Sequence, residues 1–290
     1  MNIGIVGAGK VGVSLGRFLS DSKINVVGFY DITQKNAAQA AAFTNTDSFS
    51  SVEKLVALSD TLFITTPDGA IAAAWDCIKE MSVQNKIICH FSGALSSDVF
   101  SQADKAKAFV CSVHPIMAFS DKLTSYRSLK NAFFTAEGDE KAVLAIENLF
   151  ASLGGTVYRI DKSKKTLYHT AASLLSNSVV ALLDLGYSLL SQCGFSHKEA
   201  IAATRNLVLG NVQNVVQNDC ICALTGPVER GDTKTVMEHI ESLKGSDKSL
   251  YILLSQRLLG IAKQKNEDRN YGGLEAFLNS ELAKCELTEE

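Results

Sequence analysis

Three polar side chains recur at four-residue spacing within an otherwise apolar stretch. His169, Ser173 and Asn177 occupy positions i, i+4 and i+8, which places them along one face of a helix over two turns. Burying such groups without partners would cost about 1–3 kcal/mol each. A substrate pocket would supply those partners: the imidazole could give or take a proton, and the amide could orient an oxygen. The alternative interpretation is that the three side chains hydrogen-bond to other helices.

A second polar cluster, ALTGPVERGD, lies at residues 223–232 between two predicted helices. Its Thr-Gly-Pro segment at 225–227 predicts a tight turn. Arg230 and Asp232 then offer a cation and an anion at a fixed spacing, and Arg230 could bind a carboxylate through two parallel hydrogen bonds. The alternatives are a surface ion pair between these two residues, or a cap on a helix that begins at Thr233.

Polar residues also stand where two predicted strands end. Ser92 and Gly93 follow the strand 86–91; the serine could donate a hydrogen bond to a substrate carboxylate or carbonyl, and the glycine would leave room for it. His114 lies in an exposed turn at the end of the next strand. His90 falls inside its strand, so we interpret it as a hydrogen-bonded core histidine.

The first sixteen residues, MNIGIVGAGKVGVSLG, have the pattern of a dinucleotide-binding turn. An apolar strand precedes Gly7, Gly9 and Gly12, which are spaced G-x-G-x-x-G, and helical apolar spacing follows them. The first glycine permits the bend, the second lets a pyrophosphate approach, and the third lets helix pack on strand. The phosphates would meet free N–H groups at the helix N-terminus. The predicted loop comprises Gly7, Ala8, Gly9, Lys10, Val11 and Gly12.

The second predicted strand, 24–31, ends at Asp31. An acidic residue there would bind the ribose hydroxyls and favour NAD over NADP, unless it acts as a helix cap or turn residue. Thr33, Gln34 and Lys35 follow at once and could hold a 2′-phosphate, so the choice of cofactor stays open.

The strand 61–67 ends in the Thr65-Thr66-Pro67 loop. Ligands bind at the carboxyl ends of such strands, so this loop should face the cofactor. Asp68 precedes the next predicted helix and is interpreted as its N-cap, in preference to a cofactor contact.

Strand and helix signals alternate from residue 2 to 160, and no period-two strand follows. We therefore predict an α/β Rossmann-type doubly wound parallel sheet in a dinucleotide-binding domain, 1–161, and an all-α substrate and dimerisation domain, 162–290. The stretch 162–194 has few charges and must be covered on most sides, which favours a partner chain packed on it. Further helices are predicted at 197–218, 233–243, 247–265 and 273–283.

Composition narrows the class of protein. The 290 residues are 46% hydrophobic and 20% charged, and the net charge of −3 provides no basic field for nucleic acid. We find no unbroken apolar run long enough to span a membrane, and no room for a signal peptide before the first strand, so we expect a cytoplasmic protein. The seven cysteines form no CxxC pair or His cluster, so we expect neither a metal site nor a disulfide framework.

The segments GAGKVG, TTPDGAI, HFSGALSS, SVHPIMAF, LYHTAASLLSN and LTGPVERGD, in this order, resemble the bacterial proteins described as Rossmann-like with a DUF2520 C-terminal domain. These proteins are similar in layout to the 6-phosphogluconate dehydrogenase-like group, which includes ketopantoate reductase and pyrroline-5-carboxylate reductase. The resemblance covers about residues 2–282. It implies an NADP- or NAD-linked oxidoreductase that is a homodimer through its helical domain, and some members look like an alternative ketopantoate reductase of pantothenate synthesis.

The chain departs from the wider group in two places. Many of those enzymes have a catalytic lysine four residues before the asparagine, and here that position is Ser173. This leaves His169, or a mobile Lys164 or Lys165, as the proton donor. The resemblance favours NADPH, whereas Asp31 argues for NADH.

We therefore expect a reductase that acts on a small 2-oxo acid, with 2-dehydropantoate as the best candidate substrate. His169 would donate the proton and Asn177 would orient the carbonyl. Alternatives are reduction of a cyclic imine and NAD(P) sensing without turnover. The residues expected to face the substrate are Ser92, Gly93, His114, His169, Ser173, Asn177 and Arg230.

Overall fold

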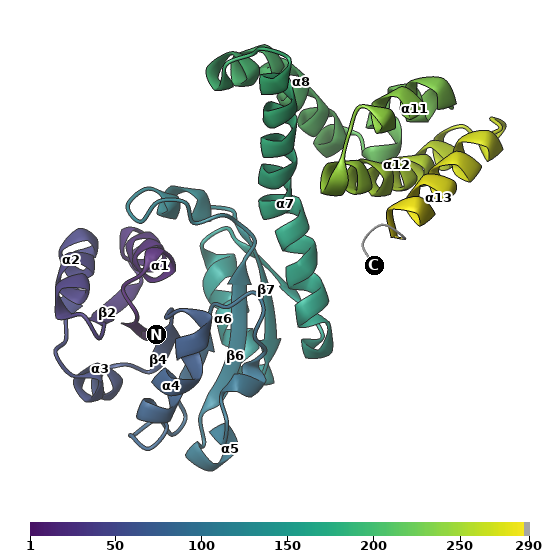
Figure 1. Ribbon diagram of the computed structural model, residues 1–290. Helices are drawn as coiled ribbons and strands as arrows, with labels where there is room; N and C mark the ends of the chain where they lie inside the picture. The colour runs from purple at the N-terminus through teal and green to yellow at the C-terminus, as the bar shows by residue number, and fades with distance from the viewer. Residues whose placement is uncertain (287–290) are drawn as a thin grey trace. The chain divides into compact units, whose positions relative to one another are not determined.

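The computed structural model describes residues 1–286, and their strands form one eight-stranded sheet in the order β3-β2-β1-β4-β5-β6-β7-β8 (Figure 1). The strand order reverses direction between β1 and β4, as in a doubly wound fold. The strands are β1 (Asn2–Val6), β2 (Asn25–Tyr30), β3 (Asp47–Ser48), β4 (Thr61–Ile64), β5 (Ile87–His90), β6 (Phe109–Pro115), β7 (Phe133–Gly138) and β8 (Thr156–Arg159).

Helices cover both faces of this sheet, and each face has its own apolar core. On one face, α1, α2 and α6 pack on residues such as Ile5 and Phe134. On the other, α3 and α4 pack on residues such as Leu62 and Ile88. The helices are α1 (Lys10–Asp21), α2 (Gln34–Thr44), α3 (Val52–Leu58), α4 (Asp68–Ile78), α5 (Ala103–Ala106) and α6 (Glu140–Ser152). The predicted Rossmann-type fold is thus confirmed.

The sheet is not parallel throughout. β7 runs antiparallel to β6, and β8 is parallel to β7, so the last two strands oppose the other six. The connection 116–132 contains only the short 3₁₀ helix η2 (Ser125–Leu129), whereas a parallel neighbour requires a longer crossover, usually an α-helix. The chain therefore reverses at this point.

After β8 the described residues form helices only. The chain divides into two compact units, Met1–Val179 and Val180–Glu290, so the first half of α7 belongs to the sheet unit. The second unit has its own core around Val236, Ile252 and Leu278. The remaining α-helices are α7 (Lys165–Gln192), α8 (His197–Gln217), α9 (Cys220–Ala223), α10 (Pro227–Arg230), α11 (Thr233–Glu241), α12 (Gly245–Lys265) and α13 (Gly272–Glu286); two further 3₁₀ helices are η1 (Ser97–Val99) and η3 (Lys162–Lys164).

Two helices expose large apolar side chains. Leu175 on α7 is 81% exposed and Val216 on α8 is 80% exposed. By length and composition, the segment Lys162–Gln192 could also cross a membrane, because its most apolar window has a mean hydropathy of 1.4. The sequence predicted no span, and one such helix is weak evidence for one. No other described residue buries the exposed apolar side chains of α7.

Candidate functional site

The glycine turn between β1 and α1 has the geometry that its sequence predicts. Gly7 adopts φ +103°, a left-handed conformation that favours glycine. A Cβ on Gly12 would overlap the Gly7 carbonyl oxygen and Thr65 Oγ1, so helix and strand approach as closely as backbone allows. Beside Gly9, by contrast, the nearest atom to an added Cβ is Thr65 O at 4.0 Å. The turn is therefore closed where the helix packs and open where a pyrophosphate would lie.

A pocket of about 780 Å³ adjoins this turn. It gathers most of the residues predicted to bind a cofactor, and its wall is continued by small residues of α4. The Thr66 Oγ1 atom is buried there without a hydrogen-bond partner, so a ligand hydroxyl or amide could satisfy it. The predicted residues in its lining are Gly7, Ala8, Gly9, Asp31, Thr65, Thr66 and Pro67. Lys10 and Val11 begin α1 beside it.

Asp31 supports the glycine turn and also lines the pocket. Its Oδ2 accepts a hydrogen bond from Ala8 N at 2.8 Å, and its Oδ1 accepts one from Thr33 N at 2.8 Å. Each carboxylate oxygen keeps a second lone pair for a ligand hydroxyl. The lining contains one further carboxylate, Glu53, and no lysine or arginine among the described residues. These residues fit a dinucleotide whose ribose carries hydroxyls.

Two imidazoles converge on Gly93, in the loop that follows β5. A Cβ on Gly93 would overlap His169 Nδ1 and lie 2.9 Å from His114 Nε2. The two rings meet edge to face, with centroids 5.9 Å apart. His169 Nδ1 is buried and has no hydrogen-bond partner. The structure therefore brings together three of the predicted substrate residues at the carboxyl ends of β5 and β6.

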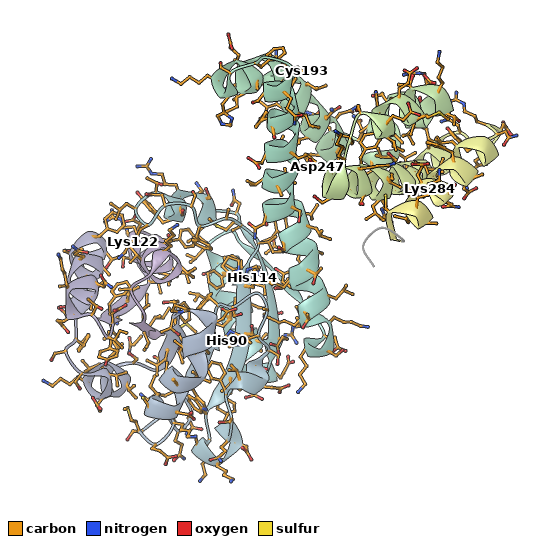
Figure 2. The ribbon with its side chains drawn as sticks, in the orientation of Figure 1. His90, His114, Lys122, Cys193, Asp247 and Lys284 are labelled. Carbon is orange, nitrogen blue, oxygen red and sulfur yellow. The ribbon has the colours of Figure 1, made fainter. Side chains whose placement is uncertain are left out.

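His114 lies within β6 and is half-buried, so the exposed turn predicted for it is wrong. It also has a partner that was not predicted. Its Nδ1 lies 2.6 Å from the Tyr168 hydroxyl, and the two rings also contact edge to face. Burial, with a smaller contribution from the Lys165 charge, lowers the pKa of His114 to about 4. This imidazole is therefore neutral at pH 7, and the phenol is positioned to donate to its Nδ1. Figure 2 labels His114 beside the N-terminal half of α7.

Lys165 opens α7 and is 1% exposed, so it is not the mobile side chain that the sequence predicted. Its Nζ donates a hydrogen bond to Ser112 Oγ on β6. Burial lowers the pKa of this lysine to about 8, and the Glu137 carboxylate opposes that shift. Lys164, in contrast, is exposed. The charge of this buried ammonium acts on the site, because it contributes to the lowered pKa of His114.

Ser92 and Asp68 pair with each other. The serine Oγ donates to Asp68 Oδ2 at 2.8 Å and accepts from the backbone N–H groups of Ala94 and Leu95 at 3.1 and 3.0 Å. The expectation that Asp68 caps α4 is wrong, because Pro67 occupies the N-cap position and Asp68 is the first helical residue. Ser92 thus braces the loop that presents Gly93.

His90 is a core histidine, as predicted, and is fully buried. Its Nε2 lies 3.1 Å from Ser96 O, and its Nδ1 accepts a hydrogen bond from Ser92 N at 3.2 Å. Burial lowers the pKa of this histidine to about 4. Both ring nitrogens contact backbone atoms, so His90 shapes the loop and offers nothing to a ligand.

Ser173 and Asn177 continue the face of α7 that starts at His169; the serine is half-buried and the asparagine exposed. Arg230 ends α10 in the second unit and is exposed. Asp232 caps α11 through Thr235 N at 3.1 Å, which matches the alternative considered for this cluster. The assignments of Ser173, Asn177 and Arg230 to a substrate stay predictions.

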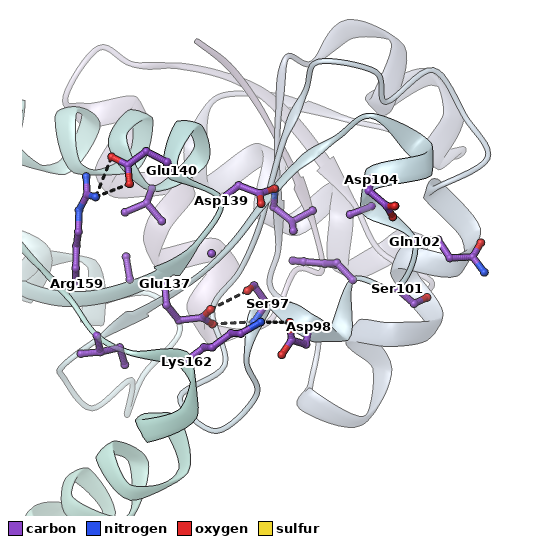
Figure 3. A pocket seen from close by; sticks show the side chains of 17 residues that line it. Ser97, Asp98, Ser101, Gln102, Asp104, Glu137, Asp139, Glu140, Arg159 and Lys162 are labelled. Carbon is purple, nitrogen blue, oxygen red and sulfur yellow. Dashed lines mark hydrogen bonds and ion pairs between the residues drawn. The ribbon is translucent and has the colours of Figure 1, made fainter.

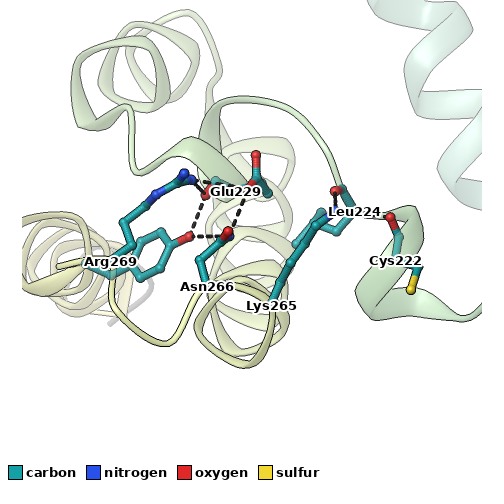
Figure 4. Close-up of polar contacts among 7 residues, drawn as sticks. Cys222, Leu224, Glu229, Lys265, Asn266 and Arg269 are labelled. Atoms are coloured by element: carbon teal, nitrogen blue, oxygen red, sulfur yellow. Dashed lines mark hydrogen bonds and ion pairs between the residues drawn. The ribbon is translucent and has the colours of Figure 1, made fainter.

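The loop before Arg230 is held by polar contacts to carbonyl oxygens (Figure 4). Lys265 Nζ donates to Leu224 O at 2.7 Å, and Arg269 donates to Glu229 O at 2.6 Å. Asn266 donates to the Glu229 carboxylate at 2.8 Å. These contacts fix the backbone that presents Arg230.

A second cavity, of about 630 Å³, contains none of the predicted site residues (Figure 3). Most of its charged side chains are engaged with their neighbours. Glu137 accepts from Ser97 Oγ at 2.7 Å, and Lys162 pairs with Asp98 at 2.9 Å. These pairs explain the polarity of the cavity without a ligand.

Comparisons with known proteins agree with this architecture. Residues 1–115 match the family model described as Rossmann-like domain, and residues 132–258 match that of the Domain of unknown function (DUF2520). No curated protein matches the chain's sequence. The chain thus joins a region that matches the Rossmann-like model to one that matches the DUF2520 model.

Solved structures share the fold over nearly the whole chain. A candidate NADP oxidoreductase from Bacteroides fragilis has a TM-score of 0.72 at 19% identity, covering 89% of this chain and 98% of its own. Protein TM1727 from Thermotoga maritima has a TM-score of 0.70 at 25% identity, covering 91% and 99%. A Plasmodium falciparum pyrroline carboxylate reductase with NADP bound has 0.61 at 15%, covering 91% and 98%. The chain has the fold of the NAD(P)-dependent oxidoreductases.

Proposed function

We propose that the protein is a reductase that uses NADH to reduce a small 2-oxo acid. The observation that supports this most strongly is the placement, on one sheet, of an open glycine turn with its pocket and of two imidazole nitrogens beside Gly93. When bound, the nicotinamide would supply the hydride. The imidazoles of His114 and His169 would hydrogen-bond to the substrate oxygen, which gains negative charge during the reaction.

The pocket supports NADH over NADPH. Asp31 and Glu53 are the charged side chains in its described lining, and both are acidic. A 2′-phosphate would be repelled by these carboxylates and would find no arginine or lysine in the lining. The ribose hydroxyls, in contrast, could donate to the remaining lone pairs of Asp31.

The test is a screen for oxidation of reduced cofactor with NADH and with NADPH. The substrates are small 2-oxo acids, including 2-dehydropantoate, and cyclic imines, including pyrroline-5-carboxylate. We expect turnover of a 2-oxo acid with NADH. Turnover of imines alone would make the protein an imine reductase. Cofactor binding without turnover of any substrate would contradict the proposed activity and support a sensing role.

We also infer that a second copy of the chain covers the exposed apolar side chains of α7 and α8. These side chains include Leu175 in the first unit and Val216 in the second, and exposed apolar side chains of this kind are typical of subunit interfaces. We expect a homodimer by light scattering, and a monomer when Leu175→Lys and Val216→Lys are combined. The matched control is Leu144→Lys on the exposed face of α6, which should stay dimeric. A monomeric wild-type chain that floats with lipid vesicles would instead favour a membrane.

A further inference from the structure

The two ring nitrogens of His114 face different groups, as a side chain that relays a proton requires. Its Nδ1 is 2.6 Å from the Tyr168 hydroxyl, and its Nε2 lies beside Gly93, where no described side chain accepts or donates to it. His169 differs, because its Nδ1 packs against Gly93 and no described group stands behind it as a second proton source. Of the two imidazoles, His114 alone is thus paired with a hydroxyl that could replace a proton it gives away.

His114 can donate a proton at neutral pH only if a second group replaces that proton. Burial lowers its pKa to about 4, and the nearby charges act in opposite directions: Lys165 and His169 lower the pKa, whereas Asp68 raises it. At neutral pH this ring has a single proton and cannot act as an imidazolium acid. A neutral ring can still pass a proton on, provided that one nitrogen receives a proton as the other loses one.

Tyr168 is suited to supply that proton. It lies on α7, one residue before His169, and is half-buried. Burial raises the pKa of its phenol, and the Thr135 side chain opposes that rise. Thr135 lies opposite His114 in the β6–β7 register, and its buried hydroxyl is close enough to the phenol to oppose that rise without forming a hydrogen bond, so it could donate one to the phenolate when the proton leaves.

We propose that Tyr168 and His114 form a two-step proton relay, in which His114 protonates the substrate oxygen and Tyr168 reprotonates His114. This rests on the proposed reductase activity. The carbonyl carbon receives a hydride and its oxygen takes the Nε2 proton; Nδ1 takes the phenol proton, which leaves the other neutral imidazole tautomer and a phenolate. A proton from water then restores the phenol. His114 is the residue that touches substrate, and Tyr168 acts through it.

The first experiment needs neither cofactor nor substrate. In protein labelled with ¹⁵N-histidine, we expect the His114 ring, one of five histidines, to stay neutral at pH 7 with its proton on Nε2. Tyr168→Phe should shift the Nδ1 resonance, whereas Tyr158→Phe, at an exposed tyrosine stacked on Phe133, should not. An imidazole with its proton on Nδ1 in the wild type would overturn the relay, whatever the protein's activity.

The second experiment measures NADH oxidation with 2-dehydropantoate, or with the 2-oxo acid that the screen identifies, in mixtures of H₂O and D₂O. The wild type should show a curved dependence of kcat on deuterium content, since two protons move. Tyr168→Phe should lower kcat by about 100-fold, leave KM unchanged and make the dependence linear. A kcat within twofold of the wild type, or an equal loss in Tyr158→Phe, would overturn the relay. Absence of turnover in the wild type would instead contradict the proposed function, and the labelled-histidine result would still decide the pairing.

Discussion

The candidate site has two ends, the glycine turn and the residues around Gly93, and they differ in what forms them. Around the glycine turn, the site depends on side chains being absent: Gly7 and Gly12 let backbone approach backbone, and the space beside Gly9 stays open. Around Gly93, it depends on side chains from β6 and α7 that meet across 54 positions of sequence. The first end is therefore defined by local backbone conformation, and the second by tertiary packing. Substitutions should separate the two.

The largest effect is expected at Gly12. In Gly12→Ala, the new Cβ would overlap Gly7 O and Thr65 Oγ1, so the turn must shift. We expect NADH affinity measured by calorimetry to fall about 100-fold, equivalent to about 3 kcal/mol. Gly69→Ala is the matched control, because a Cβ there meets nothing within 4 Å. Equal NADH affinity in the two variants would show that Gly12 is not required for a close backbone approach.

Gly93→Ala should impair the residues around Gly93 and leave cofactor binding at the glycine turn unchanged. Its Cβ would displace His169 and crowd His114, and loss of an aligned donor typically costs about 100-fold in kcat. NADH affinity should stay unchanged, because Gly93 does not line the cofactor pocket. Steady-state kinetics and calorimetry on the same preparation check this. If NADH affinity falls together with kcat, the two ends are not independent.

A smaller effect is expected when a negative charge is removed from the cofactor pocket. Asp31→Asn removes one of two carboxylates from the lining, so the ratio of NADH to NADPH affinity should fall about tenfold. Asp21→Asn makes the same charge change at the end of α1, outside the pocket, and should leave the ratio unaltered. A ratio that rises in Asp31→Asn would contradict the assigned role.

The last prediction concerns stability and its dependence on pH. Burial places the folded-state pKa of Lys165 at about 8, below the ordinary value of 10.5, so the unfolded chain binds more protons between these values. The free energy of unfolding should therefore rise between pH 8 and 10.5, by at most about 3 kcal/mol. Lys165→Met should lose this rise, and Lys164→Met, at an exposed lysine, should keep it. Denaturant titrations across this range measure the difference, and parallel curves for wild type and Lys165→Met would refute it.

The sequence predicted what local spacing determines. The G-x-G-x-x-G turn, the alternation of strands and helices, and the helix bearing His169, Ser173 and Asn177 all follow from residues close together in the chain. The prediction of Asp68 as an N-cap is wrong because the preceding Pro67 takes that position. Residues 116–132 contain no α-helix that could connect two parallel strands. This feature indicates the reversal of β7, which the prediction of a parallel sheet did not include.

Other features depend on contacts that spacing does not encode. Tyr168 is adjacent to His169, but only the packing of α7 on β6 brings its hydroxyl to His114. The burial of Lys165 against Ser112 likewise requires the folded sheet, because a lysine beside three other charged or polar residues is expected at the surface. The acidic lining of the pocket, with Glu53 next to Asp31, joins residues from separate elements.

The most direct test of the central claim uses the chain's single tryptophan. Trp75 is fully buried on α4, the helix that supplies Ala70, Ala74 and Cys77 to the pocket wall. Reduced nicotinamide absorbs where tryptophan emits, so a titration with NADH should quench Trp75 and produce nicotinamide emission that saturates. In Gly12→Ala, both changes should need about 100-fold more NADH. A wild-type protein whose Trp75 emission is unchanged by millimolar NADH and NADPH would contradict the assignment of this pocket to a dinucleotide.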